Sequence, residues 1–178
     1  LKPIQGSVEA IKGLIHQDIN LAFLTGRHIS FKEDTIKSLT SIGINEESYK
    51  LYMHNDLNPL DPINHSEEIK YKTQQMQKIS ATNNVIAAIG DRLTDISAAI
   101  IAKIPAILLE TTQFEEEEWE KIKLYEHVGL ERCDTWSQVL LNIGNFQSGS
   151  TQMIELRHSF TEQYSSWLQN LNSLSAID

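Results

Sequence analysis

Two aspartates four positions apart follow a short apolar run that ends in glycine. The run spans residues 86–89, Gly90 ends it, and Asp91 and Asp95 come next. This pattern predicts a buried strand of a parallel sheet, and such sheets bind ligands just beyond the carboxyl ends of their strands. If a helix begins near Asp91, both carboxylates lie on one of its faces and can hold a hard cation such as Mg2+. The alternative is a helix N-terminus whose acidic residues only suit the helix dipole.

A candidate anion site follows an earlier apolar run, residues 19–24. There the chain reads Thr25-Gly26-Arg27. The Thr25 hydroxyl can donate a hydrogen bond to a phosphate oxygen, and Gly26 lets the backbone approach an anion without a Cβ in the way. Arg27 can supply a bidentate cation. A simple turn after a strand is the alternative interpretation, because Thr-Gly is common in turns.

A lysine near the start of a later helix completes the set of candidate residues. Lys72 precedes Met76 and Ile79 at helical spacing, which predicts that it lies on the inward side of a helix over residues 67–79. Lys70 competes for the same role. A solvated surface lysine with no specific role is the alternative for either residue.

Composition limits the class of protein to which these residues belong. The chain has 178 residues, 40% of them hydrophobic, and a net charge of -9, which argues against broad phosphate neutralisation of a nucleic acid. A single cysteine, Cys133, excludes an internal disulfide and predicts a reducing, cytoplasmic environment. No apolar run approaches the roughly 20 residues of a membrane span, so no membrane partner is expected.

Predicted strands alternate with predicted helices along the chain. This order is typical of an α/β fold with a mainly parallel sheet between helical layers, a Rossmann-like three-layer sandwich. Ser7 is the expected N-cap of the first helix, and Gly43 the expected stop of the second. The expected helices cover residues 8–15, 31–42, 67–79, 96–102, 115–125 and 135–143, and the expected strands cover 19–24, 49–53, 85–89 and 106–109. Residues 54–66 are expected to form a loop.

The order of these motifs resembles that of the haloacid dehalogenase superfamily of phosphohydrolases. The second motif of that family is an apolar strand ending in Thr or Ser, matched by Thr25. The third is a lysine, matched by Lys72, and the fourth is an acid pair, matched by Asp91 and Asp95. The resemblance covers residues 3–109 and implies a Mg2+-dependent phosphomonoester hydrolase that acts through an aspartyl-phosphate.

The resemblance also implies roles for single residues. Thr25, Lys72 and Asp91 are the expected catalytic residues, and Thr25, Gly26 and Lys72 the expected phosphate ligands. Asp91 and Asp95 are the expected Mg2+ ligands. The residues between Thr25 and Lys72 are taken up by predicted elements, which leaves no room for an inserted cap domain there. An open site of this kind suits a phosphorylated small molecule or a phosphorylated macromolecular end.

The first motif of the family, an apolar strand ending in Asp-x-Asp, is missing from these 178 residues. In the family that strand lies at the centre of the sheet, between the strands that end at Thr25 and at Asp91. Leaving it out would expose backbone donors and acceptors on both neighbours. We therefore expect the nucleophile to lie upstream of Leu1.

The C-terminal residues 149–178 are expected to form a helical extension of an α/β core at residues 1–148. Within 150–177, apolar residues recur at helical spacing and predict a long amphipathic helix. Its apolar face can pack on the core or form a homodimer or partner contact. A non-catalytic binding or scaffolding domain that uses this helix is the alternative function.

Overall fold

The computed structural model describes residues 3–55 and 64–148 of the chain. The loop expected at residues 54–66 falls largely between these ranges, and the helix expected at 150–177, with its possible homodimer contact, lies outside them. In chain order the elements are α1 (Ser7–His16), β1 (Leu21–His28), a 3-10 turn (Ile29–Phe31), α2 (Lys32–Ser41), a second 3-10 turn (Glu46–Ser48), β2 (Tyr49–His54), α3 (His65–Thr82), β3 (Ala88–Gly90), α4 (Leu93–Ile101), β4 (Ala106–Leu109), α5 (Glu116–Glu126), β5 (Leu130–Cys133) and α6 (Trp136–Ser148).

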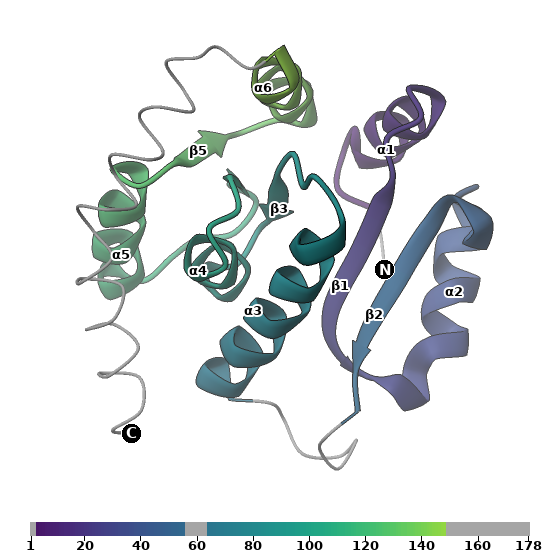
Figure 1. The fold of residues 1–178 in the computed structure, drawn as a ribbon, viewed down its shortest axis with the longest axis horizontal. Coiled ribbons are helices and arrows are strands. Elements are labelled where there is room, and N and C mark those ends of the chain that lie inside the picture. Colours follow the sequence, from purple (N-terminus) through teal and green to yellow (C-terminus); the bar gives the residue numbers. More distant parts are fainter. Residues whose placement is uncertain (1–2, 56–63, 149–178) are drawn as a thin grey trace.

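The strands form two separate parallel sheets. β1 pairs with β2, and β4 pairs with β3 on one side and β5 on the other, all in parallel. Among the described residues, β1 and β3 have no hydrogen bonds to each other. α3 lies between the two sheets and contacts both β1 and α4 (Figure 1). The mixed α/β fold with parallel strands confirms the predicted class.

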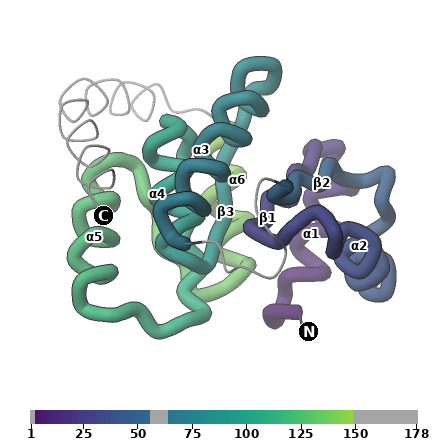
Figure 2. Tube along the Cα trace, turned by 90° about the horizontal axis from the view of Figure 1, so that it is seen from below, coloured from purple at the N-terminus to yellow at the C-terminus, as the bar shows by residue number. Residues whose placement is uncertain are grey.

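Strand β4 shows the three layers most clearly, because both of its faces are buried. Ala106 and Leu108 pack with α4 and α5, together with Ile122 and Tyr125. Ile107 and Leu109 point the other way and pack with α1, β5 and α6. Side chains of a strand alternate between its faces, so helices cover both sides of this sheet. Figure 2 shows the tube of the same arrangement from below, with β1, β2, α1 and α2 grouped apart from α4 and α5.

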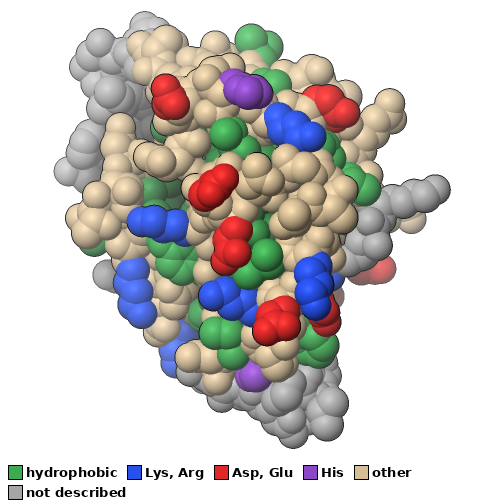
Figure 3. All heavy atoms as spheres, turned by 90° about the vertical axis from the view of Figure 1, so that its right-hand side faces the viewer, with side chains coloured by type: hydrophobic (Ala, Val, Ile, Leu, Met, Phe, Trp, Pro, Cys, Tyr) green, Lys and Arg blue, Asp and Glu red, His purple; other side chains and the backbone are tan. Residues whose placement is uncertain are grey.

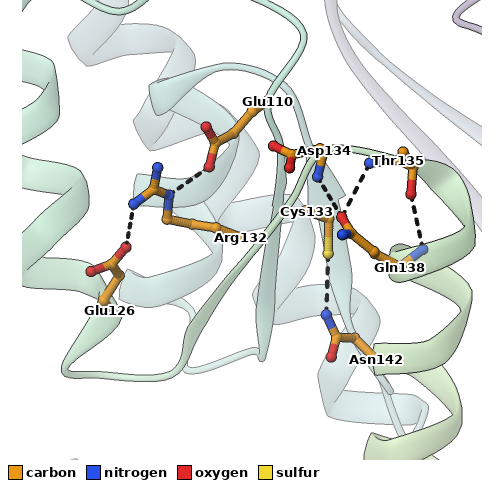
Figure 4. A network of polar contacts seen from close by, with 8 residues as sticks. All are labelled: Glu110, Glu126, Arg132, Cys133, Asp134, Thr135, Gln138 and Asn142. Atoms are coloured by element: carbon orange, nitrogen blue, oxygen red, sulfur yellow. Dashed lines mark hydrogen bonds and ion pairs between the residues drawn. The ribbon is translucent and has the colours of Figure 1, made fainter.

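Polar contacts hold β5 and the start of α6 in place (Figure 4). The Arg132 guanidinium donates to Glu110 at 2.5 Å and to Glu126 at 2.9 Å, which ties β5 to the ends of β4 and α5. Thr135 and Gln138 cap α6 reciprocally: the Thr135 hydroxyl accepts from the Gln138 amide, and the Gln138 side chain accepts from the Thr135 amide.

One face of the molecule carries acidic and basic side chains side by side (Figure 3). On the face turned toward the viewer in Figure 3, the right-hand side of Figure 1, residues of both signs are interspersed. Within residues 3–55 and 64–148, no helix has both the length and the apolar composition needed to cross a membrane.

Several predicted helices and strands begin or end at other residues in the structure, and one strand was not predicted. Gly6, with φ 80°, is the N-cap of α1, and Ser7 is its first helical residue, without a side-chain cap bond. β1 continues through Thr25 to His28 because its last residues still pair with β2. α4 begins at Leu93, which brings Asp95 into its first turn. Strand β5 was not expected, because Glu131 and Arg132 interrupt its apolar residues.

Two leucines provide a test of the three-layer packing. Leu108 is completely buried in β4, whereas Leu141 on α6 is 66% exposed. We expect Leu108→Ala to lower the free energy of unfolding by about 2–5 kcal/mol, because it leaves a cavity. Leu141→Ala, the control, changes it by about 0.5 kcal/mol or less. Urea unfolding followed by circular dichroism measures both, and similar losses in the two variants would contradict the described core.

Candidate active site

The candidate residues gather where the carboxyl ends of β1 and β3 meet α3. Thr25 lies near the end of β1, and Asp91 comes directly after β3. Lys72 lies in α3, the helix between the two sheets, and Asp95 lies in the first turn of α4. Three of these residues therefore lie in three different elements and Asp91 lies in the turn after β3, as expected for a site at the carboxyl edge of parallel strands.

The Thr25-Gly26 segment forms a bulge in β1. Thr25 is opposite Met53 and His28 is opposite His54, so Gly26 and Arg27 are extra residues on the β1 side. The Arg27 amide donates to the Thr25 hydroxyl oxygen at 3.2 Å, and this bond stabilises the bulge. Because the hydroxyl accepts this bond, its own proton remains available for a ligand oxygen. Bulges commonly re-aim side chains next to active sites.

Lys72 is a buried ammonium with two carboxylate partners. The residue is only 3% exposed, and its Nζ lies 2.5 Å from Glu68 Oε1 and 2.5 Å from Asp95 Oδ1. Lys70, two positions away on α3, is exposed. The structure therefore places Lys72, rather than Lys70, beside Asp95, and the helical spacing predicted its inward orientation correctly.

Asp95 is packed so closely that it requires the glycine at the end of β3. A Cβ at Gly90 would lie 2.3 Å from the Asp95 Cβ and 2.9 Å from its Oδ2, both far below van der Waals contact. Burial raises the pKa of the Asp95 carboxyl, and Glu68 and Asp91 raise it further, while Lys72 lowers it. A bound cation would act in the same direction as Lys72 and favour the ionised form.

Asp91 has the chemistry of a cation ligand. Its Oδ2 accepts a hydrogen bond from the Thr111 hydroxyl at 3.3 Å, and its backbone oxygen accepts one from Thr112 at 3.2 Å. Neither aspartate acts as the N-cap of α4, because that position is Arg92, which makes no side-chain cap bond. Carboxylate oxygens are the ligands that Mg2+ prefers, and waters commonly complete its shell. In the part of the chain that the structure describes, no group of three or more acidic, His or Cys side chains converges as a metal site.

The sequence analysis missed Glu68, which is 3% exposed and contacts both Lys72 and the β1 bulge. A Cβ at Gly26 would lie 3.0 Å from Glu68 Oε1, so the glycine accommodates this carboxylate. The predicted contact of the Gly26 amide with phosphate stays a prediction. The signal for Glu68 was present in the sequence: it precedes Lys72 by four residues, a spacing that places both on one helix face.

The buried ion cluster predicts a large difference between two lysines of α3. Lys72→Met leaves Glu68 and Asp95 without their shared cation, and we expect a loss of about 3–5 kcal/mol in the free energy of unfolding. The matched control Lys70→Met removes an exposed charge and should change it by about 0.5 kcal/mol or less. Denaturant titrations of the purified variants measure both values. Equal stabilities would show that Lys72 is not buried among these carboxylates.

The close packing at Gly90 predicts that a single methyl group disturbs the site. Gly90→Ala forces β3 and Asp95 apart, and overpacking of this kind costs about 1–3 kcal/mol. Gly13 in α1 has open space at its Cβ position, so Gly13→Ala, the control, should raise stability by about 0.5–1 kcal/mol through helix propensity. Thermal unfolding compares the two. A Gly90→Ala protein as stable as the wild type would contradict the described contact.

Comparison with models of protein families places the chain in a superfamily. A family model described as HAD superfamily, subfamily IIIB (acid phosphatase), matches residues 1–126. No curated protein and no solved structure matches the chain. The matched residues run from α1 through α5 and include Thr25, Lys72, Asp91 and Asp95. The chain therefore belongs to subfamily IIIB, the acid phosphatase subfamily, of the haloacid dehalogenase superfamily.

Proposed function

We propose that this protein is a Mg2+-dependent phosphomonoester hydrolase that acts through an aspartyl-phosphate. The observation that carries the proposal is the buried Lys72, whose ammonium is paired with Asp95 in the first turn of α4. Glu68, the other partner of Lys72, lies against Gly26, the residue after Thr25. A lysine, a hydroxyl and two carboxylates at the carboxyl edge of parallel strands are suited to binding a phosphate and a divalent cation together.

The charges around Lys72 support a requirement for the cation. Three carboxylates, of Glu68, Asp91 and Asp95, face two cationic side chains, those of Lys72 and Arg92. An incoming phosphate dianion would add to this negative charge and be repelled. Asp91 and Asp95 would hold Mg2+, which supplies the positive charge that offsets nucleophile and phosphate.

The side chains of the chain itself have distinct roles in the proposed reaction. The Thr25 hydroxyl donates to one phosphoryl oxygen, because those oxygens accept hydrogen bonds and the bond from the Arg27 amide leaves the hydroxyl proton unused. Lys72 neutralises charge on another oxygen. A carboxylate attacks phosphorus and expels the alcohol, and water then cleaves the acyl phosphate, which releases inorganic phosphate and restores the carboxylate.

The attacking carboxylate is proposed to come from an additional strand. Within the described residues, β1 pairs only with β2 and β3 only with β4, which leaves one backbone edge of each strand without a partner strand. Apolar residues on both sides, including Leu21 of β1 and Ile89 of β3, pack against one common core cluster. A strand paired between β1 and β3 would satisfy both edges and end between Thr25 and Asp91.

The substrate is proposed to be a phosphomonoester of a small molecule or of a macromolecular end. The segment between β1 and α3 contributes a helix and a strand rather than an inserted domain in its described part, which favours an open site. We place the reaction in the cytoplasm, because the only cysteine, Cys133, is a free and buried thiol.

Phosphate release tests this function. The product of the complete reading frame is incubated with Mg2+ and a panel of phosphorylated sugars, nucleotides, peptides and nucleic-acid ends. We expect turnover of at least one substrate that is lost in chelator and restored by Mg2+. Asp91→Asn should lower kcat/KM by about 100-fold or more, because it removes a metal-binding charge. Asp34→Asn, an exposed aspartate on α2, is the matched control and should retain activity.

Two results would overturn the proposal. The first is a folded protein that releases no phosphate from any member of the panel with Mg2+ present. The second is turnover that Asp91→Asn leaves unchanged, since the activity would then belong to another site. The non-catalytic alternative predicts the first of these results.

A further inference from the structure

Glu68 is a buried carboxylate for which the proposed reaction has no use. It is 3% exposed and lies in the first turns of α3, four residues before Lys72. A buried carboxylate is costly unless it is paired and hydrogen-bonded. Its partners are the Lys72 ammonium at 2.5 Å and, more weakly, the Arg92 guanidinium at 3.8 Å. The placement of this charge therefore depends mainly on Lys72.

The same carboxylate contacts the bulge that carries Thr25. Its Oε1, the atom that accepts from Lys72, would lie 3.0 Å from a Cβ at Gly26. This one oxygen therefore lies between the β1 bulge and the lysine of α3. Any larger residue at position 26 would push the carboxylate away from the bulge.

Asp95 has two competing partners if a cation binds at the site. Its Oδ1 accepts from Lys72, and the same carboxylate is a proposed Mg2+ ligand. Coordination of the Asp95 carboxylate to a divalent cation weakens its attraction for the Lys72 ammonium. Without a second anchor, Lys72 would then be free to leave its position beside the phosphate.

We propose that Glu68 is a positioning residue that holds the Lys72 ammonium in place while Asp95 binds the cation. This role rests on the proposed phosphate and Mg2+ site. Glu68 contacts neither phosphate nor cation in this account and acts only through Lys72 and the Gly26 bulge. Its buried side chain has the i,i+4 geometry that places it beside Lys72 whether or not Asp95 is engaged.

The sign of the effect on phosphate binding separates this role from a simple charge effect. Glu68→Gln removes a negative charge near the site, which by electrostatics alone would strengthen binding of an anion. Loss of the anchor for Lys72 would weaken it instead. Glu67→Gln is the matched control, because Glu67 neighbours Glu68 on the same turn and is exposed.

The experiment measures binding of inorganic phosphate in the presence of Mg2+, and of Mg2+ alone, by calorimetry with the product of the complete reading frame. We expect Glu68→Gln to weaken phosphate binding about tenfold, the scale of a lost charge-assisted hydrogen bond. Its Mg2+ affinity should be unchanged or higher, and Glu67→Gln should resemble the wild type. Unchanged or tighter phosphate binding by folded Glu68→Gln would overturn the proposal.

A second measurement on the wild-type protein does not depend on the variant folding. Proton–nitrogen NMR of lysine side chains detects ammonium groups that exchange slowly with water, as a buried and doubly paired Lys72 should. We expect the Lys72 signal to persist when Mg2+ is added, because Glu68 still holds the ammonium. Loss of the signal on adding Mg2+ would overturn the positioning role. Wild-type protein that binds Mg2+ and keeps this signal but does not bind phosphate would instead contradict the proposed function.

Discussion

The candidate site is built around one buried ion cluster, in which the Lys72 ammonium lies between the carboxylates of Glu68 and Asp95. Each contact joins different parts of the fold: Glu68 reaches the bulge of β1, and Asp95 belongs to the first turn of α4 behind Gly90. Buried charges of this kind are stable only in a fixed geometry, since each loses water and must regain its partners. The cluster thus connects the β1 bulge and α4 through α3, and it presents a cation at the place where phosphate is proposed to bind.

The helix that carries Lys72 also joins the two separate sheets. β1 and β3 each lack a hydrogen-bonded neighbour on one side within the described residues, while α3 contacts β1 and α4 across both halves. The halves are therefore joined by helix packing and by the Lys72 contacts rather than by a continuous sheet. In the proposed mechanism, a strand paired between β1 and β3 would bring the attacking carboxylate to the carboxyl edge of the sheet.

Much of the fold could be predicted from local pattern, and the errors have physical causes. Strand β4 was predicted with its observed bounds, because an uninterrupted apolar run follows Pro105 and both faces are buried. Strand β5 was missed because two adjacent charged residues, Glu131 and Arg132, interrupt its apolar residues, and Arg132 forms ion pairs with distant Glu110 and Glu126. Lys72 was oriented correctly from helical spacing, whereas Glu68 and the reason for Gly26 emerged only from contacts between elements. Helical period is a local property, but which oxygen meets which glycine is set by tertiary packing.

The most direct test of the central claim is a crystal structure of the complete protein soaked with Mn2+ as a substitute for Mg2+, with anomalous scattering used to locate the ion. We expect one strong anomalous peak, from an Mn2+ ion bound by the Asp91 and Asp95 carboxylates, with Lys72 still held by Glu68. A peak elsewhere, or an empty site in a crystal that holds Mn2+ at other positions, would contradict that claim.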